Sequence, residues 1–297
     1  MAFTAVKLTD PVSGQSCVMM PRDGVTVMSL DVQPTVRAVS EERVSADGQL
    51  DTTAHLSAAA VSLSLRLWIS NDGLTTPETF LDEIGLFLDP SLRPNLIVSN
   101  DKWSTDRRLT VRFDSSTKPI DNPLTTDFSL SFKAPKGIWE SAGLIEVNIP
   151  SIIAISGGVA VTVAANGIAV QTSGIPVTAH TLSGNPVVTS VGNKSVPWTA
   201  KLYGPATGPK LANDTLGLTL EFSDAVVLNA GDYVQLDYLN RTALLNSSSA
   251  QSQLGFLNFS SSDWWILAPG LNSLRYYPTS AGPGAVTIIN YRTGWIT

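Results

Sequence analysis

The C-terminal third of the chain constrains the fold most, because short apolar and aromatic runs alternate there with turn residues. Each run spans about 4–8 residues, and Gly, Pro, Asn or Asp recur every ~8–12 residues. This spacing is too short for ordinary helices and is typical of antiparallel sheets. Residues 185–297 are therefore predicted to form a β-sandwich. Its expected strands are 186–191, 198–203, 215–222, 233–238, 242–246, 253–259, 264–267, 272–277 and 285–291.

The densest aromatic signal in this region is a pair of adjacent tryptophans followed by a Pro-Gly turn. In an extended chain Trp264 and Trp265 point to opposite faces, so one indole is expected to be buried while the other covers the sandwich edge. If Trp265 points inward, Leu267 shares its buried face. Pro269 and Gly270 suit the two central positions of a type II turn. The alternative for an exposed tryptophan is stacking on a sugar ring.

A hairpin tip is predicted at Asn240, where an alternating strand ends. Asp237 and Arg241 flank this tip and could form an ion pair. An exposed pair contributes only about 0–1 kcal/mol, so we expect it to fix the register of the hairpin rather than to carry chemistry.

The region 1–139 is predicted to be an α+β domain. Residues 61–69 alternate between apolar and polar side chains, which predicts a strand with one buried face. A helix is predicted where Thr76 can cap it, Pro77 suits the first position, and Glu78 lies at the positive end of the helix dipole. Its apolar face would be formed by Phe80, Leu81, Ile84, Phe87 and Leu88. The expected strands are 25–32, 36–39, 56–69, 96–99, 109–113 and 128–134.

Between these regions, residues 140–184 are predicted to form a β-rich connecting segment. From 147 to 193 the only ionisable side chain is His180. The stretch 152–170 has the length of a membrane-spanning helix. Its glycines and its density of β-branched residues favour strands broken by turns, so no membrane insertion is expected.

The charge of the chain limits the classes of partner that it can bind. Charged residues make up 15% of the chain, against about 25% in a typical domain, so parts of the surface are expected to be covered by protein contacts. The formal net charge is −6 and no basic run is present. Both features argue against a protein that binds nucleic acid through its phosphates.

Cysteine and histidine usage indicates no cofactor or metal site and no enzyme. Cys17 is the only cysteine, so no disulfide or CxxC cluster is available, and the N-terminus lacks a secretory pattern. Synthesis in the cytoplasm is therefore expected. His55 and His180 lie in no catalytic motif. Carboxylate pairs occur at 41–42 and 82–83, the second on the solvated face of the predicted helix, although a glycan hydrolase dyad would form only in three dimensions.

Several motifs occur in an order that points to one family. They are Asn185-Pro186-Val187-Val188, Leu202-Tyr203-Gly204-Pro205, the stretch from Gly231 to Tyr238, Arg241-Thr242, the stretch from Trp264 to Asn272, Tyr291-Arg292 and, more loosely, Phe128 to Pro135. Their arrangement resembles the distal tail proteins of long-tailed siphophages, most of all the minor tail proteins of phages that infect actinobacteria. The residues expected to shape this motif are Asp237, Arg241, Trp264, Trp265, Pro269, Gly270 and Asn272.

The resemblance implies a galectin-like β-sandwich in the C-terminal half and a ring-forming domain in the N-terminal half. Six copies would form a hexameric ring at the tail tip or baseplate of the virion, with an axial channel for DNA. The implied partners are the tail tube protein, the tail hub and the tape measure protein. The alternative is a carbohydrate-binding adhesion module that recognises host surface glycans. Some family members carry an inserted sugar-binding module, for which the linker here leaves no space.

Overall fold

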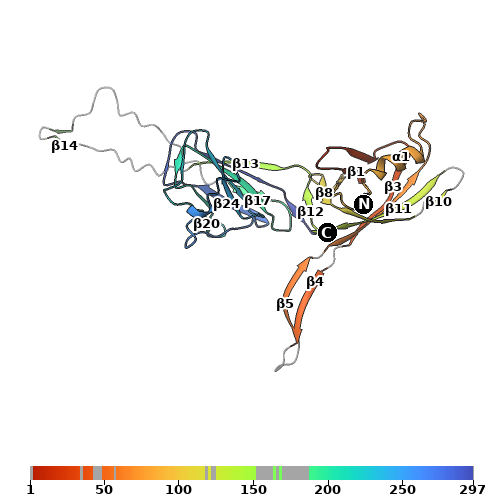
Figure 1. Cartoon of the computed structure of the whole chain (residues 1–297), viewed down its shortest axis with the longest axis horizontal. Coiled ribbons are helices and arrows are strands. Elements are labelled where there is room, and N and C mark those ends of the chain that lie inside the picture. Colours follow the sequence, from red (N-terminus) through yellow and green to blue (C-terminus); the bar gives the residue numbers. More distant parts are fainter. Residues whose placement is uncertain are drawn as a thin grey trace. The chain divides into compact units, whose positions relative to one another are not determined.

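The computed structural model divides the chain into two compact units (Figure 1). Unit 1 comprises Met1–Leu144, Val191–Lys194 and Arg292–Thr297, and unit 2 comprises Ile145–Ser190 and Ser195–Tyr291. The structure describes residues 3–33, 36–42, 49–56, 58–117, 120–121, 125–151, 163–164, 167–168 and 187–296. Antiparallel strands dominate both units, so the predicted mainly β fold class is confirmed.

The first sheet of unit 1 has six strands. Their order is β2 (Ser16–Met20), β1 (Phe3–Thr9), β7 (Asn95–Asn100), β8 (Arg107–Thr110), β12 (Trp139–Ser141) and β27 (Gly294–Trp295). In β27, Trp295 lies opposite Trp139, and Gly294 lies opposite Glu140. The C-terminal segment therefore supplies the edge strand of a sheet that is otherwise built from the N-terminal half.

The second sheet of unit 1 is built around the alternating strand that the sequence predicted. Its order is β10 (Ile120–Asp121), β11 (Thr126–Ala134), β6 (Ala59–Leu67) and β3 (Val25–Gln33), and β9 (Arg112–Ser116) also pairs with β11. The residues of β6 alternate between buried and exposed, with Val61, Leu63, Leu65 and Leu67 in the core. The alternation of apolar and polar residues along β6 thus places one face of the strand in the core, as the sequence predicted.

Two further strands of unit 1, β4 (Val36–Glu42) and β5 (Gln49–Leu56), form a hairpin (Figure 1). Among the described strands, neither pairs with a third one. Both outer edges therefore keep backbone donors and acceptors that a further strand could use. The side chains of His55, Glu41 and Glu42 lie outside the described residues.

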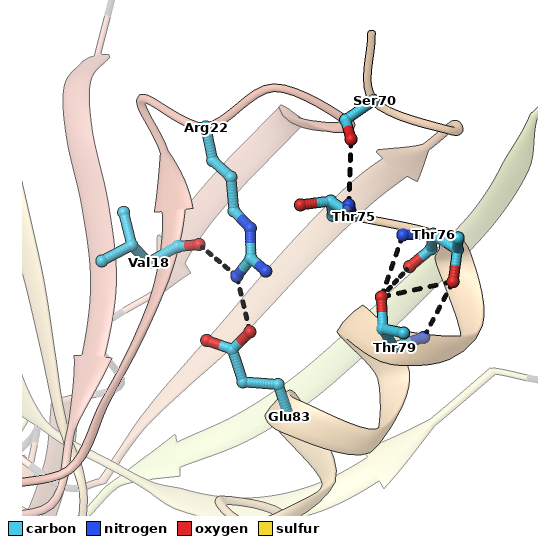
Figure 2. Close-up of polar contacts among 7 residues, drawn as sticks. All are labelled: Val18, Arg22, Ser70, Thr75, Thr76, Thr79 and Glu83. Carbon is cyan, nitrogen blue, oxygen red and sulfur yellow. Dashed lines mark hydrogen bonds and ion pairs between the residues drawn. The ribbon is translucent and has the colours of Figure 1, made fainter. Parts of the chain in front are cut away.

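The helix α1 (Pro77–Gly85) begins as predicted. Thr76 caps it, because its hydroxyl accepts from the Thr79 N–H while the Thr79 hydroxyl accepts from the Thr76 N–H (Figure 2). Phe80 and Ile84 are buried in the core of unit 1. Arg22 follows β2 and donates to Glu83 at 2.7 Å, which links the helix to that edge of the six-stranded sheet.

The predicted strand 109–113 is wrong as a single element. The chain forms β8 up to Thr110 and β9 from Arg112, and the two strands belong to different sheets. At the break Val111 is buried, and its N–H donates to the Pro94 carbonyl oxygen. The run of alternating apolar residues from Leu109 to Phe113 continues across this break, so it does not reveal that the chain passes from one sheet to the other.

Unit 2 contains a five-stranded and a four-stranded sheet over one shared apolar core. The first has the order β13 (Ile145–Pro150), β26 (Val286–Tyr291), β17 (Trp198–Tyr203), β22 (Tyr233–Asp237) and β23 (Thr242–Leu245). The second has the order β16 (Val187–Ser190), β24 (Gly270–Tyr276), β19 (Lys210–Asn213) and β20 (Leu218–Glu221). Short pairs complete the unit: β18 (Ala206–Thr207) with β21 (Val227–Leu228) and β25 (Ser280–Ala281), and β14 (Val163–Ala164) with β15 (Gly167–Ile168).

The connecting segment 140–184 contributes a strand to unit 2, because β13 pairs with β26 over its whole length. Ile149 of β13 is buried in the core of the unit. The side chains of residues 152–186, among them His180, lie outside the described residues.

Two predicted strands of unit 2 are wrong. Within 253–259 the chain forms a short 3₁₀ helix, Leu254–Phe256, in which the Phe256 N–H donates to the Gln253 carbonyl oxygen. The stretch 264–267 makes only one bridge, Leu267 opposite Val196. The Trp265 carbonyl oxygen accepts a hydrogen bond from a side chain instead, namely the Trp198 Nε1–H.

Candidate binding surfaces

The tryptophan pair of unit 2 divides between core and edge. Trp265 is 1% exposed, and its ring lies 4.4 Å from that of Trp198. Leu267 is buried beside it, on the face that the alternation predicts. Trp264 is half-buried and stacks on Trp198 at 6.4 Å and 27°. Trp265 therefore belongs to the core, where stacking on a sugar ring is not available to it.

Arg241 covers the exposed side of this cluster and does not pair with Asp237. Its guanidinium lies 4.1 Å from the Tyr238 ring centroid and 5.4 Å from that of Trp264. The Asp237 carboxylate accepts from the N–H groups of Leu239 and Asn240, which closes the hairpin tip. Among the ion pairs of the described residues, Asp237 with Arg241 is absent. The arginine thus gains more from two aromatic faces than from an exposed carboxylate.

The Pro-Gly turn is held by a buried asparagine. Gly270 has φ +88°, the positive value expected for the second central position. The Asn272 side chain is fully buried; its oxygen accepts from the Ala268 N–H at 3.1 Å, and its amide donates to the Ala268 carbonyl oxygen at 2.9 Å. Both ends of the amide are therefore used to close the turn. Pro269, Gly270 and Asn272 act on the backbone, with no group left over for a ligand.

Unit 1 contains a pocket that the sequence did not indicate. It has a volume of about 200 Å³ and is lined by Lys102, Trp103, Ser104, Thr105, Arg107, Val191 and Trp295. The guanidinium of Arg107 lies between two indoles, 4.2 Å from the Trp103 ring and 4.3 Å from the Trp295 ring. Residues separated by most of the chain meet here because β27 returns to the edge of the sheet.

Among the described residues, Arg107 has no carboxylate partner. Its Nε–H is buried without an acceptor, and burial lowers the pKa of the guanidinium from its ordinary value. The neighbouring Arg108, by contrast, pairs with Glu140 at 2.7 Å. No acidic side chain lines the pocket, although Asp101 and Asp106 are exposed nearby in the chain. The pocket therefore presents unneutralised positive charge.

A second concave surface lies on the outer face of the second sheet of unit 1. It has a volume of about 340 Å³ and is lined by Met28, Ser64, Leu65, Arg66, Thr117, Asp127, Phe128 and Ser129. Two parallel hydrogen bonds of 2.7 and 2.8 Å join Arg66 to Asp127, so their charges neutralise each other. Short polar side chains flank this pair, with Ser64 and Ser129 2.9 Å apart. Such a face suits contact with another protein surface.

The remaining chemical candidates among the described residues do not come together in a site. Of the acidic pair on α1, Glu83 binds Arg22 while Asp82 faces solvent. No group of His, Cys, Asp and Glu side chains that could hold a metal ion is found among the described residues. The described helix is too short and polar to cross a membrane.

Comparisons with known proteins agree with the motif order. Residues 191–295 match the family of siphovirus-type tail components, C-terminal domain. The Dit protein of phage SPP1, described as a paradigm of the hub adsorption apparatus of phages that infect Gram-positive bacteria, has a similar fold. It shares 12% identity over 99% of both chains, with a TM-score of 0.61.

Two chains from the baseplate of phage P2 are weaker matches. One comes from the structure of the baseplate in its activated conformation with Ca, and it matches with 12% identity over 98% of both chains and a TM-score of 0.48. The other comes from the structure with Sr, and it matches with 12% identity over 97% of both chains and a TM-score of 0.47. No curated protein sequence matches the chain. Residues 191–295 thus match the C-terminal domain of siphovirus-type tail components, and the chain shares the fold of the SPP1 Dit protein over nearly its whole length.

Proposed function

We propose that six copies of this chain form a ring at the tip of the phage tail, with an axial channel through which DNA leaves the virion. The observation that carries the proposal is the fold shared over nearly the whole chain with the SPP1 Dit protein, a component of a hub adsorption apparatus. In this role the ring joins the tail tube protein to the tail hub, beside the tape measure protein. The chain would be made in the host cytoplasm and built into the virion from there.

The surface of unit 1 supports a role in assembly. Strand β3 is an edge of its sheet, and neither β4 nor β5 pairs with a third strand in the part of the chain that the structure describes. The 340 Å³ surface beside the Arg66–Asp127 pair offers a polar face of short side chains. Strand edges of this kind pair readily with other chains, so we assign ring formation to unit 1.

The charge of the assembly supports the channel. Six chains at −6 each give a formal charge of 6 × (−6) = −36. A negative lumen repels the phosphates of passing DNA, whereas a basic lumen would bind them and release counterions. We therefore expect no sequence-specific binding of nucleic acid.

Glycan recognition by the sandwich is the weaker candidate. A sugar ring needs a free indole face, and the Trp264 ring already stacks on Trp198 and lies 5.4 Å from the Arg241 guanidinium. Binding of host glycans at this cluster would require Arg241 to leave two aromatic rings. Glycan-array binding by the full chain, lost in Trp264→Ala, would favour this candidate.

Size measurements on the purified chain test the ring directly. Light scattering across a concentration series should show a species of six chains, and negative-stain images should show closed rings with a central hole. Addition of duplex DNA at physiological salt should produce no complex. A strict monomer at all concentrations would contradict self-assembly, and tight DNA binding would contradict the channel.

A further inference from the structure

The described lining of the Arg107 pocket contains basic and hydroxyl side chains and no acidic one. Two indoles hold the guanidinium in place, and Lys102 adds a second positive charge at the rim. Ser104 and Thr105 supply hydroxyl donors on the same lining. Arg107 is half-buried, so a negatively charged ligand beside its guanidinium offsets the partial loss of hydration. The chemistry of the lining therefore selects a carboxylate.

The size and the aromatic faces argue against a sugar. A volume of about 200 Å³ lies below the ~300–1,000 Å³ of ordinary small-molecule sites and suits a single side chain. The inner faces of Trp103 and Trp295 are already occupied by Arg107. An acidic side chain of a protein fits these conditions, whereas an oligosaccharide does not.

The same unit carries exposed carboxylates on a rigid element. Glu78 and Asp82 lie one turn apart on α1, and both face solvent. Neither takes part in any ion pair among the described residues. Residues four apart lie on one face of a helix, so the two carboxylates form a short acidic stripe.

The stripe and the pocket lie at opposite edges of one sheet. Helix α1 is linked through Glu83 and Arg22 to the edge formed by β2, and Trp295 belongs to β27 at the other edge. Figure 1 draws α1 and β8 well apart within the unit. Contact between two different surfaces is a head-to-tail contact, and repetition of such a contact closes a ring.

We propose that the Arg107 pocket of one copy receives the acidic stripe of α1, Glu78 and Asp82, from the neighbouring copy. The inference rests on the proposed ring and specifies which surfaces of unit 1 meet. The indoles orient Arg107 toward one carboxylate of the stripe, and Lys102 binds the other carboxylate. This contact neutralises charge that both surfaces carry alone.

A charge-swap cycle tests the pairing through assembly. Lys102 is exposed, so Lys102→Glu should leave the fold intact and weaken association at least ~10-fold, because like charges then face each other. Adding Asp82→Lys to that variant should restore assembly. Lys136→Glu, the same change at an exposed site of unit 1 that does not line the pocket, serves as the matched control. Equal association of the Lys102→Glu and Lys136→Glu variants would overturn the proposed contact while leaving the ring intact.

Cysteine cross-linking tests the contact without requiring stable rings. Ser104 is exposed on the pocket lining and Leu86 is 59% exposed just beyond the stripe, whereas the native Cys17 is buried. Oxidation of the Ser104→Cys, Leu86→Cys double variant should give a ladder that extends past the dimer. Each single variant can link only two copies. A ladder from a chain that scatters as a monomer supports the contact and contradicts stable rings, and a double variant that yields no more than the single variants overturns the contact.

Discussion

The Nε1–H of Trp198 donates to the main-chain oxygen of Trp265 at 2.8 Å, while the Nε1–H of Trp265 is buried without an acceptor. The two rings lie 4.4 Å apart and both belong to the apolar core of unit 2. One indole therefore serves both as a packing surface and as a replacement for a strand hydrogen bond. The Trp265 indole contributes to the stability of unit 2 through packing.

Truncation of the two adjacent tryptophans should have unequal effects on unit 2. Trp265→Ala is expected to lower the free energy of unfolding by about 3–5 kcal/mol, because it leaves a cavity beside Trp198. Trp264→Ala should cost much less, since its ring is half-buried. Denaturant unfolding followed by fluorescence measures both changes. Small and equal losses would place both indoles at the surface.

Gly270 allows the conformational cost of the Pro-Gly turn to be measured separately from crowding. Its φ is +88°, and a Cβ there would meet no atom within 4 Å. Gly270→Ala should therefore destabilise unit 2 by roughly 1–2 kcal/mol through backbone strain alone. Gly255→Ala is the control, because Gly255 also has open space and lacks a positive φ. If the two variants unfold alike, the turn is not fixed by Gly270.

A fragment of residues 145–291 should fold better than one of residues 185–297. The fragment that begins at residue 145 keeps β13, which pairs with β26 and buries Ile149. The fragment that begins at residue 185 lacks β13 and leaves that edge of β26 exposed. Circular dichroism during heating should show a cooperative transition for 145–291 at a higher temperature. A higher or equal transition temperature for 185–297 would make β13 dispensable and support an independent sandwich from residue 185.

The thiol of Cys17 should report on the opening of unit 1. Burial, with a smaller contribution from Glu83, raises its pKa from 9.0 to about 12. The folded state holds the proton more tightly than the unfolded state, so the resulting stability is present below about pH 9 and is lost as the pH rises toward 12. Alkylation at pH 8.5 should be slow until denaturant is added. Cys17→Ala should lack this part of the pH dependence, and rapid alkylation of the native chain would contradict the burial.

Local signals predicted much of the fold and little of the candidate site. The alternation of Val61, Leu63 and Leu65 predicts a half-buried strand, and Thr76 with Pro77 predicts a helix start, because these patterns act within a few residues. The pocket of Arg107 and Trp295 depends on strand pairing across the length of the chain. The spacing of apolar residues along the sequence does not indicate which distant strands pair, so it could not predict that Arg107 and Trp295 lie together. The pairing of Asp237 with Arg241 failed because Arg241 packs on the rings of Tyr238, which is local, and Trp264, which is distant in sequence.

Strand β27 also sets an order of events during synthesis. Strands β12 and β27 are neighbours in space, but all of unit 2 lies between them in the sequence. On the ribosome, the six-stranded sheet cannot be completed until unit 2 has been translated. A nascent chain arrested before residue 292 lacks Trp295 and leaves the edge of β12 open, so it holds Arg107 on one side only. Completion of unit 1 thus depends on residues that follow unit 2 in the sequence.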